Sequence, residues 1–185
     1  FSIINSLILL VLMPVFGINQ GAQPIMGYNY GAKKFDRVRK TYWFAAIIAS
    51  VWVIICFAGT MIFPAQLVGL FSKKDENFEY LIKYGVLGIR IVLLTLPILG
   101  FQIVSTSYFQ AVGKPKKAMV VSLLRQFLIL APLAYVMPKI FVQFFGQQQG
   151  VNGLFWASPV SDVLAFFITI YMVYTEMRML KRQGG

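Results

Sequence analysis

The chain has 185 residues, of which 58% are hydrophobic and 12% are charged, and its formal net charge is +11. Because soluble domains carry about 25% charged residues, this composition excludes an ordinary soluble domain and predicts an integral membrane protein. The basic residues lie in short segments between long apolar runs, so we interpret them as signals of membrane topology and expect no nucleic-acid partner.

Five segments are long and apolar enough to cross a lipid bilayer, which requires about 20 residues. In chain order they span residues 1–28, 44–63, 84–112, 118–145 and 151–175. Turn-forming or polar residues separate these segments, so the sequence predicts an all-α polytopic helix bundle embedded in the bilayer. The chain starts without Met and inside an apolar run, so we expect it to be a fragment with further sequence upstream.

The polar segments between the spans alternate between rich and poor in basic residues. Segments 29–43 and 113–117 and the C-terminal tail are the rich ones. Because basic segments stay on the cytoplasmic side, we expect these three to face the cytoplasm in a multi-pass protein of the inner (plasma) membrane. Residues 32–40 are expected to form a short interfacial helix, with Phe35, Val38 and Tyr42 on one side.

Asp162 is the one acidic residue inside a predicted span, and it lies near the middle of that span. A charged carboxylate is costly at this depth, so Asp162 is our candidate for ion coupling through uptake and release of a proton. The alternative is a structural Asp that pairs with a base. Arg125 could be that base, or its long side chain could extend along the helix to the cytoplasmic interface.

Other polar side chains within the apolar spans are candidates for a substrate cavity or a gate. Together with the arginine of the fourth span, they are Gln20, Gln23, Gln102, Ser105, Arg125 and Gln126. Pro97 lies one turn before the polar stretch of the third span, where it is expected to kink the helix and expose carbonyls to a cavity. The alternative is that these side chains only form hydrogen bonds between helices.

The sequence has no glycine-rich phosphate loop, no nucleophile motif, no paired carboxylates and no histidine, and it has one cysteine. We therefore expect no enzymatic activity, no metal site and no cofactor. Transport by this chain would need an ion gradient or a missing partner as its energy source.

Four segments of the chain resemble a known family. Residues 17–39 (GINQGAQPIMGYNYGAKKFDRVR) closely resemble the second-helix signature of the multidrug and toxic compound extrusion (MATE) family. Segments 109–118 (FQAVGKPKKA), 122–126 (SLLRQ) and 157–162 (ASPVSD) are also similar to that family. The resemblance implies twelve helices in two pseudo-symmetric six-helix lobes. Residues 1–185 would then be a partial C-terminal lobe, with five of its six transmembrane helices.

The resemblance implies a secondary active antiporter that exports organic cations or drugs in exchange for protons or sodium, by alternating access as two lobes rock. Its partners would be the missing N-terminal lobe and the preceding helix of the same protein. Members of the family place coupling carboxylates on the first, seventh or tenth helix, but the span that matches the tenth has Gln102 and no acid. Two alternatives stay open: a lipid-linked polysaccharide flippase of the same superfamily, and a non-transporting membrane subunit.

Overall fold

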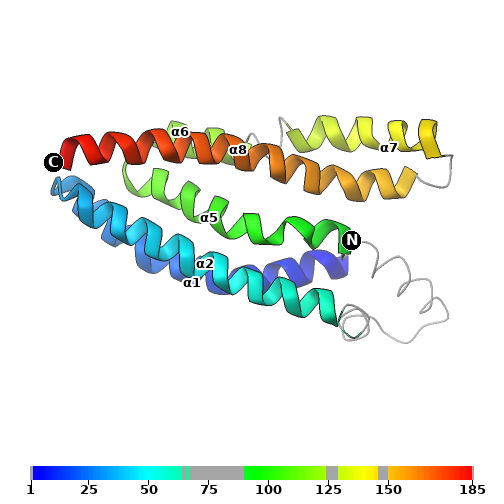
Figure 1. Ribbon diagram of the computed structural model, residues 1–185, viewed down its shortest axis with the longest axis horizontal. Helices are drawn as coiled ribbons and strands as arrows, with labels where there is room; N and C mark the ends of the chain where they lie inside the picture. The colour runs from blue at the N-terminus through cyan, green and yellow to red at the C-terminus, as the bar shows by residue number, and fades with distance from the viewer. Residues whose placement is uncertain (1, 64–65, 67–89, 124–128, 146–149, 185) are drawn as a thin grey trace.

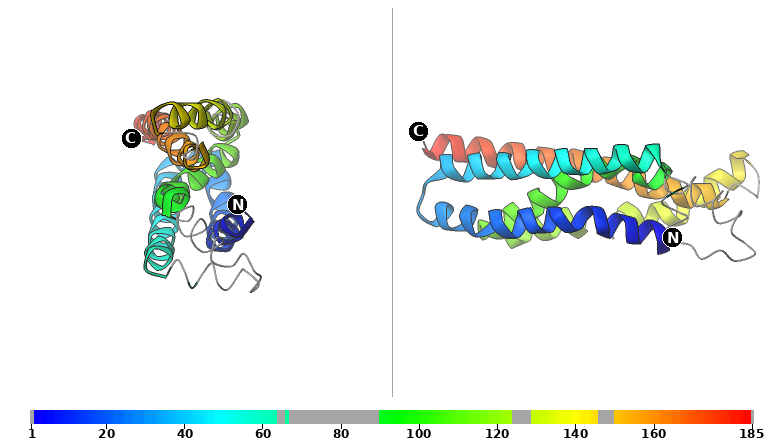
Figure 2. Two further views of the ribbon diagram at one scale, coloured as in Figure 1. Left: turned by 90° about the vertical axis from the view of Figure 1, so that its right-hand side faces the viewer. Right: turned by 90° about the horizontal axis from the view of Figure 1, so that it is seen from below.

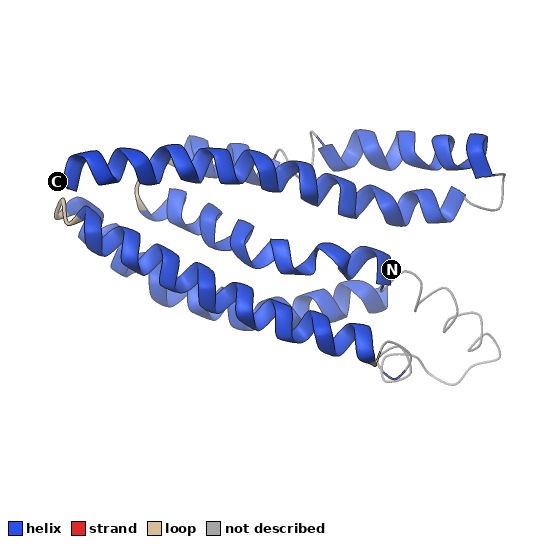
Figure 3. Cartoon of the chain, in the orientation of Figure 1, coloured by secondary structure: helices blue, strands red, loops and turns tan. Residues whose placement is uncertain are grey.

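The computed structural model describes residues 2–63, 66, 90–123, 129–145 and 150–184. Its elements are the helices α1 (Ser2–Gly31), α2 (Phe35–Ile62), η1 (Leu93–Thr95), α5 (Leu96–Ala111), α6 (Pro115–Leu123), α7 (Ala131–Phe145) and α8 (Gly150–Gly184). No strand occurs in these residues (Figure 3), so the predicted all-α class is confirmed.

The long helices run along one common axis, so the turns between them gather at the two ends of the bundle (Figures 1 and 2). The C-terminus, the α1–α2 turn and the α5–α6 turn lie toward one end. The N-terminus and the end of α2 lie toward the other. The three segments that the sequence predicts on the cytoplasmic side therefore share one end of the molecule.

Within the described residues, four helical stretches are long and apolar enough to cross a membrane: Asn5–Gly31, Phe35–Ile62, Arg90–Ala111 and Trp156–Gln183. Large apolar side chains on them are exposed, as Phe44 (69%) shows on α2, which is the surface that a bilayer favours. The remaining predicted span, 118–145, contains α6 and α7 with residues 124–128 between them, which lie outside the described part of the chain.

The core lies where α5 packs against α1, α2 and α8. Its largest fully buried apolar and aromatic side chains are Leu7, Val15, Met26, Val38, Tyr42, Leu93, Leu96, Tyr108, Phe109 and Leu180. Between α1 and α2, the Trp52 indole N–H donates a hydrogen bond to the Val11 carbonyl at 3.0 Å. Helix α7 packs along α8.

Two helices differ from their expected bounds. Residues 35–40 do not form a separate interfacial helix but are the first turns of α2, because no Gly or Pro interrupts the sequence before Gly59. Of the three residues expected on one side of this helix, Val38 and Tyr42 are fully buried and Phe35 is half-buried. Likewise, α8 continues to Gly184, well past the end of the predicted span 151–175.

The prolines act differently in the different helices. Pro159 lies inside α8, which remains one helix through that position. In contrast, the 3₁₀ turn η1 immediately precedes α5, and Pro97 occupies the first turn of α5. This local change of helix type lies directly before Pro97, where the sequence predicts a kink and where the proline lacks an amide hydrogen to donate to the preceding turn.

Candidate functional site

Buried polar groups gather around Asp162, where α8 packs against η1 and α5. Asp162 is 2% exposed, and its carboxylate Oδ2 accepts a hydrogen bond from the Thr95 hydroxyl at 2.8 Å. About two turns after Thr95, on α5, the side-chain amide of Gln102 donates a hydrogen bond to the Asp162 backbone carbonyl at 3.0 Å. The only acid in the predicted spans is therefore held by contacts from both η1 and α5, as buried polar groups require.

A second buried contact connects α5 to α2. The hydroxyls of Tyr42 and Ser105 lie 2.9 Å apart, and both residues are fully buried. The Ser105 hydroxyl donates to the Phe101 carbonyl at 2.7 Å, so the Tyr42 hydroxyl is the donor in the first bond. Ser105 thus fixes the position of α2 against α5 rather than presenting a free hydroxyl to a ligand.

A cavity of about 280 Å³ opens between α1, α5 and α6. It is lined by Phe16, Gln102, Ile103, Thr106, Ser107, Val121 and Ser122. Its volume is near the lower limit of ligand pockets, which span roughly 300–1,000 Å³. None of these lining residues is charged, and Gln102 is the residue that joins the cavity to Asp162.

The sequence-predicted site residues do not all meet at one place. Gln102, Ser105 and Asp162 lie in the α2–α5–α8 packing, whereas Gln20 is exposed and Gln23 half-buried on α1. Arg125 and Gln126 lie outside the described residues, and with them the predicted contact between Arg125 and Asp162.

One buried polar side chain on α1 was not among the candidates. Asn19 is 4% exposed, and neither atom of its side-chain amide has a hydrogen-bond partner among the described residues. It lies beside Gln20 in the polar patch of the first span, which is the signal that could have identified it. A buried amide without partners is costly, so Asn19 marks a position that the rest of the protein or a bound molecule would satisfy.

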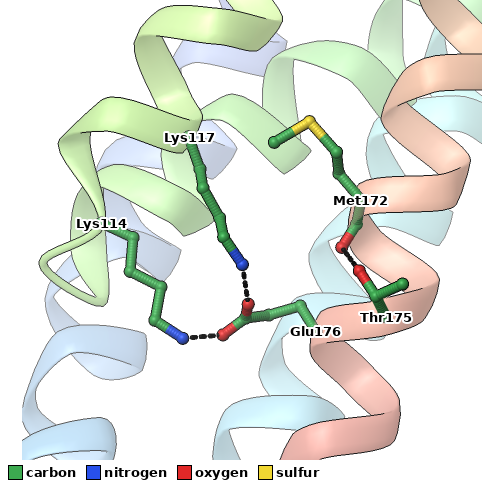
Figure 4. A network of polar contacts seen from close by, with 5 residues as sticks. All are labelled: Lys114, Lys117, Met172, Thr175 and Glu176. Atoms are coloured by element: carbon green, nitrogen blue, oxygen red, sulfur yellow. Dashed lines mark hydrogen bonds and ion pairs between the residues drawn. The ribbon is translucent and has the colours of Figure 1, made fainter.

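Sequence reasoning also missed a cluster of charges at the end of the bundle that holds the C-terminus (Figure 4). Glu176 of α8 is fully buried, and its two carboxylate oxygens meet the ammonium groups of Lys114 and Lys117, the second at 2.7 Å. The two lysines come from the α5–α6 turn and the start of α6. We call these three residues the Glu176 cluster.

Aromatic rings and the carboxylate together stabilise the charged lysines of the Glu176 cluster. The Lys114 ammonium lies 5.7 Å from the centre of the Tyr30 ring, and that of Lys117 lies 5.8 Å from the Phe109 ring. Burial lowers the pKa of Lys114, but the hydrogen bond and charge of Glu176 outweigh this effect and raise the pKa above its ordinary value of 10.5. Lys114 therefore stays charged at neutral pH, and the contacts of the cluster tie α8 to the α5–α6 turn.

Known proteins with similar sequences are multidrug exporters. MepA of Staphylococcus aureus (strain MSSA476), a "multidrug export protein", is 23% identical over 162 residues, which cover 86% of this chain and 32% of that protein. MepA of Staphylococcus haemolyticus (strain JCSC1435) is 19% identical over 161 residues, with 87% and 32% covered. The chain thus spans about a third of the length of the curated relatives that it matches.

Solved structures share the fold. The MATE multidrug transporter DinF-BH, solved in complex with a ligand, is 38% identical, with a TM-score of 0.78 over 91% of this chain and 35% of that chain. A MATE family transporter in its outward-facing conformation is 19% identical, with a TM-score of 0.85 over 98% of this chain and 39% of that chain. An inward-facing conformation, also 19% identical, gives a TM-score of 0.85 over 98% and 40%.

The family model described as MatE matches residues 1–136, which is well over half of the sequence and includes α1, α2, η1, α5 and α6. This match includes three of the four segments on which the sequence resemblance rests. The helical membrane fold and the likeness to solved MATE transporters agree with it. The chain therefore belongs to the MatE family of multidrug and toxic compound extrusion proteins.

Proposed function

We propose that the chain forms most of the C-terminal lobe of a secondary active antiporter, which exports organic cations or drugs in exchange for protons or sodium. The match of residues 1–136 to the family model carries this proposal. The names of the relatives support the substrate class, since MepA is a multidrug export protein and DinF-BH is a multidrug transporter. The proposed location is the inner membrane, with segments 29–43 and 113–117 and the C-terminus in the cytoplasm.

Alternating access by rocking lobes requires that a lobe keeps its shape while it moves. The fold of this chain superposes on an outward-facing and on an inward-facing transporter with the same TM-score of 0.85. The cross-helix contacts at Asp162, Ser105 and the Glu176 cluster support the same view, because each joins two helices of the chain. We infer that the chain moves as one body.

The cavity between α1, α5 and α6 is the proposed contribution of this lobe to the substrate path. Its lining combines the Phe16 ring with the polar groups of Gln102, Thr106, Ser107 and Ser122. An aromatic ring and a few hydrogen-bonding groups suit a flat, largely apolar ligand. Among the described residues, the lining is uncharged, so the countercharge for a cation would come from elsewhere in the protein.

Asp162 is the proposed ion-coupling residue of this chain. Its carboxylate is buried and bonded to Thr95, and Gln102 connects its backbone to the cavity. Through Gln102, substrate in the cavity and the ion on Asp162 would influence each other. The competing role is structural, in which Asp162 only fixes α8 against η1 and α5.

The test is substrate efflux by the full-length protein that contains this chain, with the variant Asp162→Asn and ethidium as the organic cation. An Asn side chain can still accept the Thr95 hydrogen bond, so folding should be retained while proton uptake at this position is lost. We expect ethidium efflux to fall by about 100-fold or more, since a positioned proton-transfer group typically contributes at least that factor. The measurement uses inverted membrane vesicles energised by a proton or a sodium gradient.

Asp36→Asn is the matched control, because it makes the same chemical change on an exposed side chain near the start of α2. It should export ethidium like the wild type. Normal gradient-driven efflux by a well-folded Asp162→Asn protein would reject the coupling role. Absence of ethidium export by the wild type, together with transport of a lipid-linked polysaccharide, would instead support the flippase alternative.

A further inference from the structure

A groove of about 400 Å³ lies on the exposed face of α2, near the N-terminal end of that helix. The residues that line it are Asp36, Arg39, Lys40, Trp43, Phe44 and Ile47. Figure 1 shows that this part of α2 lies toward the end of the bundle that holds the C-terminus and the α1–α2 turn. The groove is separate from the α1–α5–α6 cavity, with which it shares no lining residue.

The first part of the groove, nearest the α1–α2 turn, is positively charged and contains hydrogen-bond donors that are not fully used within the described residues. Two bases, Arg39 and Lys40, face one acid, Asp36. The contact between Arg39 Nη1 and Asp36 Oδ1 is long, at 3.5 Å, and the Asp36 side chain is 68% exposed, so this pair contributes little. Arg39 Nε is shielded from solvent and has no hydrogen-bond partner among the described residues, which leaves the guanidinium incompletely satisfied.

The second part of the groove is apolar and follows directly along the helix. Trp43 is 46% exposed, Phe44 69% and Ile47 59%, and α2 is long and apolar enough to cross a membrane. Tryptophan favours the level of lipid headgroups, and exposed Phe and Ile favour the acyl chains below that level. The change from cationic to apolar over two turns thus coincides with the expected surface of the bilayer.

We propose that this groove binds an anionic phospholipid from the leaflet around the α1–α2 turn. Arg39 and Lys40 donate hydrogen bonds to the lipid phosphate, for which the planar guanidinium is well suited. The first segment of an acyl chain lies on Phe44 and Ile47, with Trp43 at the boundary. The charge complementarity of the two bases and the continuity with an apolar membrane surface favour a lipid over a soluble anion.

The test measures phosphatidylglycerol binding to the purified full-length protein in detergent, with bound lipids counted by native mass spectrometry. The groove variant Arg39→Gln/Lys40→Gln should weaken binding by roughly 10- to 30-fold, since two bases at a membrane surface are removed. Lys181→Gln/Arg182→Gln is the matched control, because it removes the same charge from exposed positions in the last turn of α8. It should bind like the wild type.

A third variant separates a lipid from a free anion. Phe44→Ser leaves both bases in place but removes apolar contact, so it should also weaken phosphatidylglycerol binding, and millimolar inorganic phosphate should not displace the lipid. Equal weakening by both double variants would overturn the proposal, as would equal affinity of the wild type for phosphatidylcholine. Displacement by inorganic phosphate, or wild-type lipid affinity in the Phe44→Ser protein, would also overturn it. These readouts do not depend on transport.

Discussion

At the scale of single residues, the Glu176 cluster joins a buried acid to two bases from a distant part of the chain. A fully buried carboxylate is stabilised by nearby opposite charges, and here two ammonium groups meet its two oxygens. The lysines themselves are 29% and 38% exposed, so water reaches them but not the acid. Removing the acid should therefore cost less than breaking a pair that is buried on both sides.

Glu176→Gln keeps the shape of the side chain but leaves the two lysines without a countercharge. We expect the free energy of unfolding to fall by about 1–3 kcal/mol, with both lysines partly compensated by water. Thermal denaturation of the full-length protein in detergent measures this loss. Lys116→Gln, in the same turn but outside the cluster, should leave the melting temperature unchanged; equal melting of Glu176→Gln and wild type would show that the cluster contributes nothing.

The raised pKa of Lys114 fixes the pH range in which its contribution is available. Because the folded pKa lies above the ordinary value of 10.5, the stabilisation is complete below pH 10.5 on the lysine side and is lost only as the pH rises through the folded pKa. At neutral pH the full contribution of Lys114 is therefore present.

At the scale of helices, α7 and α8 approach each other closely at Gly153, the most crowded of the described glycines. A Cβ atom built on Gly153 would lie 2.8 Å from both the Met137 carbonyl oxygen and the Pro138 Cα, and both are backbone atoms that cannot rotate away. In contrast, a Cβ on Gly59 of α2 would meet no atom within 4 Å. Substitution of Gly153 therefore tests close packing between helices, whereas substitution of Gly59 tests helix propensity alone.

Gly153→Ala should destabilise the protein by about 1–3 kcal/mol, because the backbones of α7 and α8 must move apart. Gly59→Ala should raise stability by about 0.5–1 kcal/mol, since Ala is the better helix former where space is available. Melting temperatures of both variants in detergent check this pair of opposite signs. A stability gain in Gly153→Ala would contradict the close approach of the two helices.

At the scale of the whole molecule, a rigid lobe predicts constant distances within this chain during transport. Spin labels at Tyr28→Cys on α1 and Tyr174→Cys on α8 occupy exposed positions, in a background where Cys56→Ser and any cysteines elsewhere in the protein are replaced. Their separation should change by less than about 2 Å between substrate-loaded and ion-loaded states. Pulsed electron paramagnetic resonance measures it; a larger shift would mean that the lobe itself deforms.

Much of the fold was predictable because the membrane imposes simple rules. Apolar length identified the spans, and α1 (Ser2–Gly31) closely follows the expected 1–28. The same rule ended the last predicted span at residue 175, because Glu176 and the basic residues after it are too polar for the bilayer interior. The helix nevertheless continues to Gly184, and Glu176 within it meets Lys114 and Lys117 from about sixty positions earlier. A contact so distant in sequence leaves no local signal.

The candidate site was predictable in kind but not in arrangement. An acid and amides within apolar spans indicated buried polar contacts, and Asp162 and Gln102 indeed share one. The partners were not readable: Thr95 bonds Asp162 and Tyr42 bonds Ser105, and neither residue stands out in the sequence as a contact before the helices pack. Gln20 and Gln23 looked equivalent to Gln102 in the sequence, yet they differ from it in burial because only packing decides which side of a helix is covered.

By itself, the sequence determined that the protein is a bundle of membrane helices and that its basic segments share one side. It also determined which family the chain resembles. Composition, apolar length and short motifs are local properties, and the bilayer converts them directly into helices and orientation. Only the tertiary structure decided that Asp162 meets Thr95, that Glu176 meets two lysines, and that Arg39 and Lys40 border an apolar groove. These features depend on which faces of separate helices are brought together, and packing across the chain sets that choice.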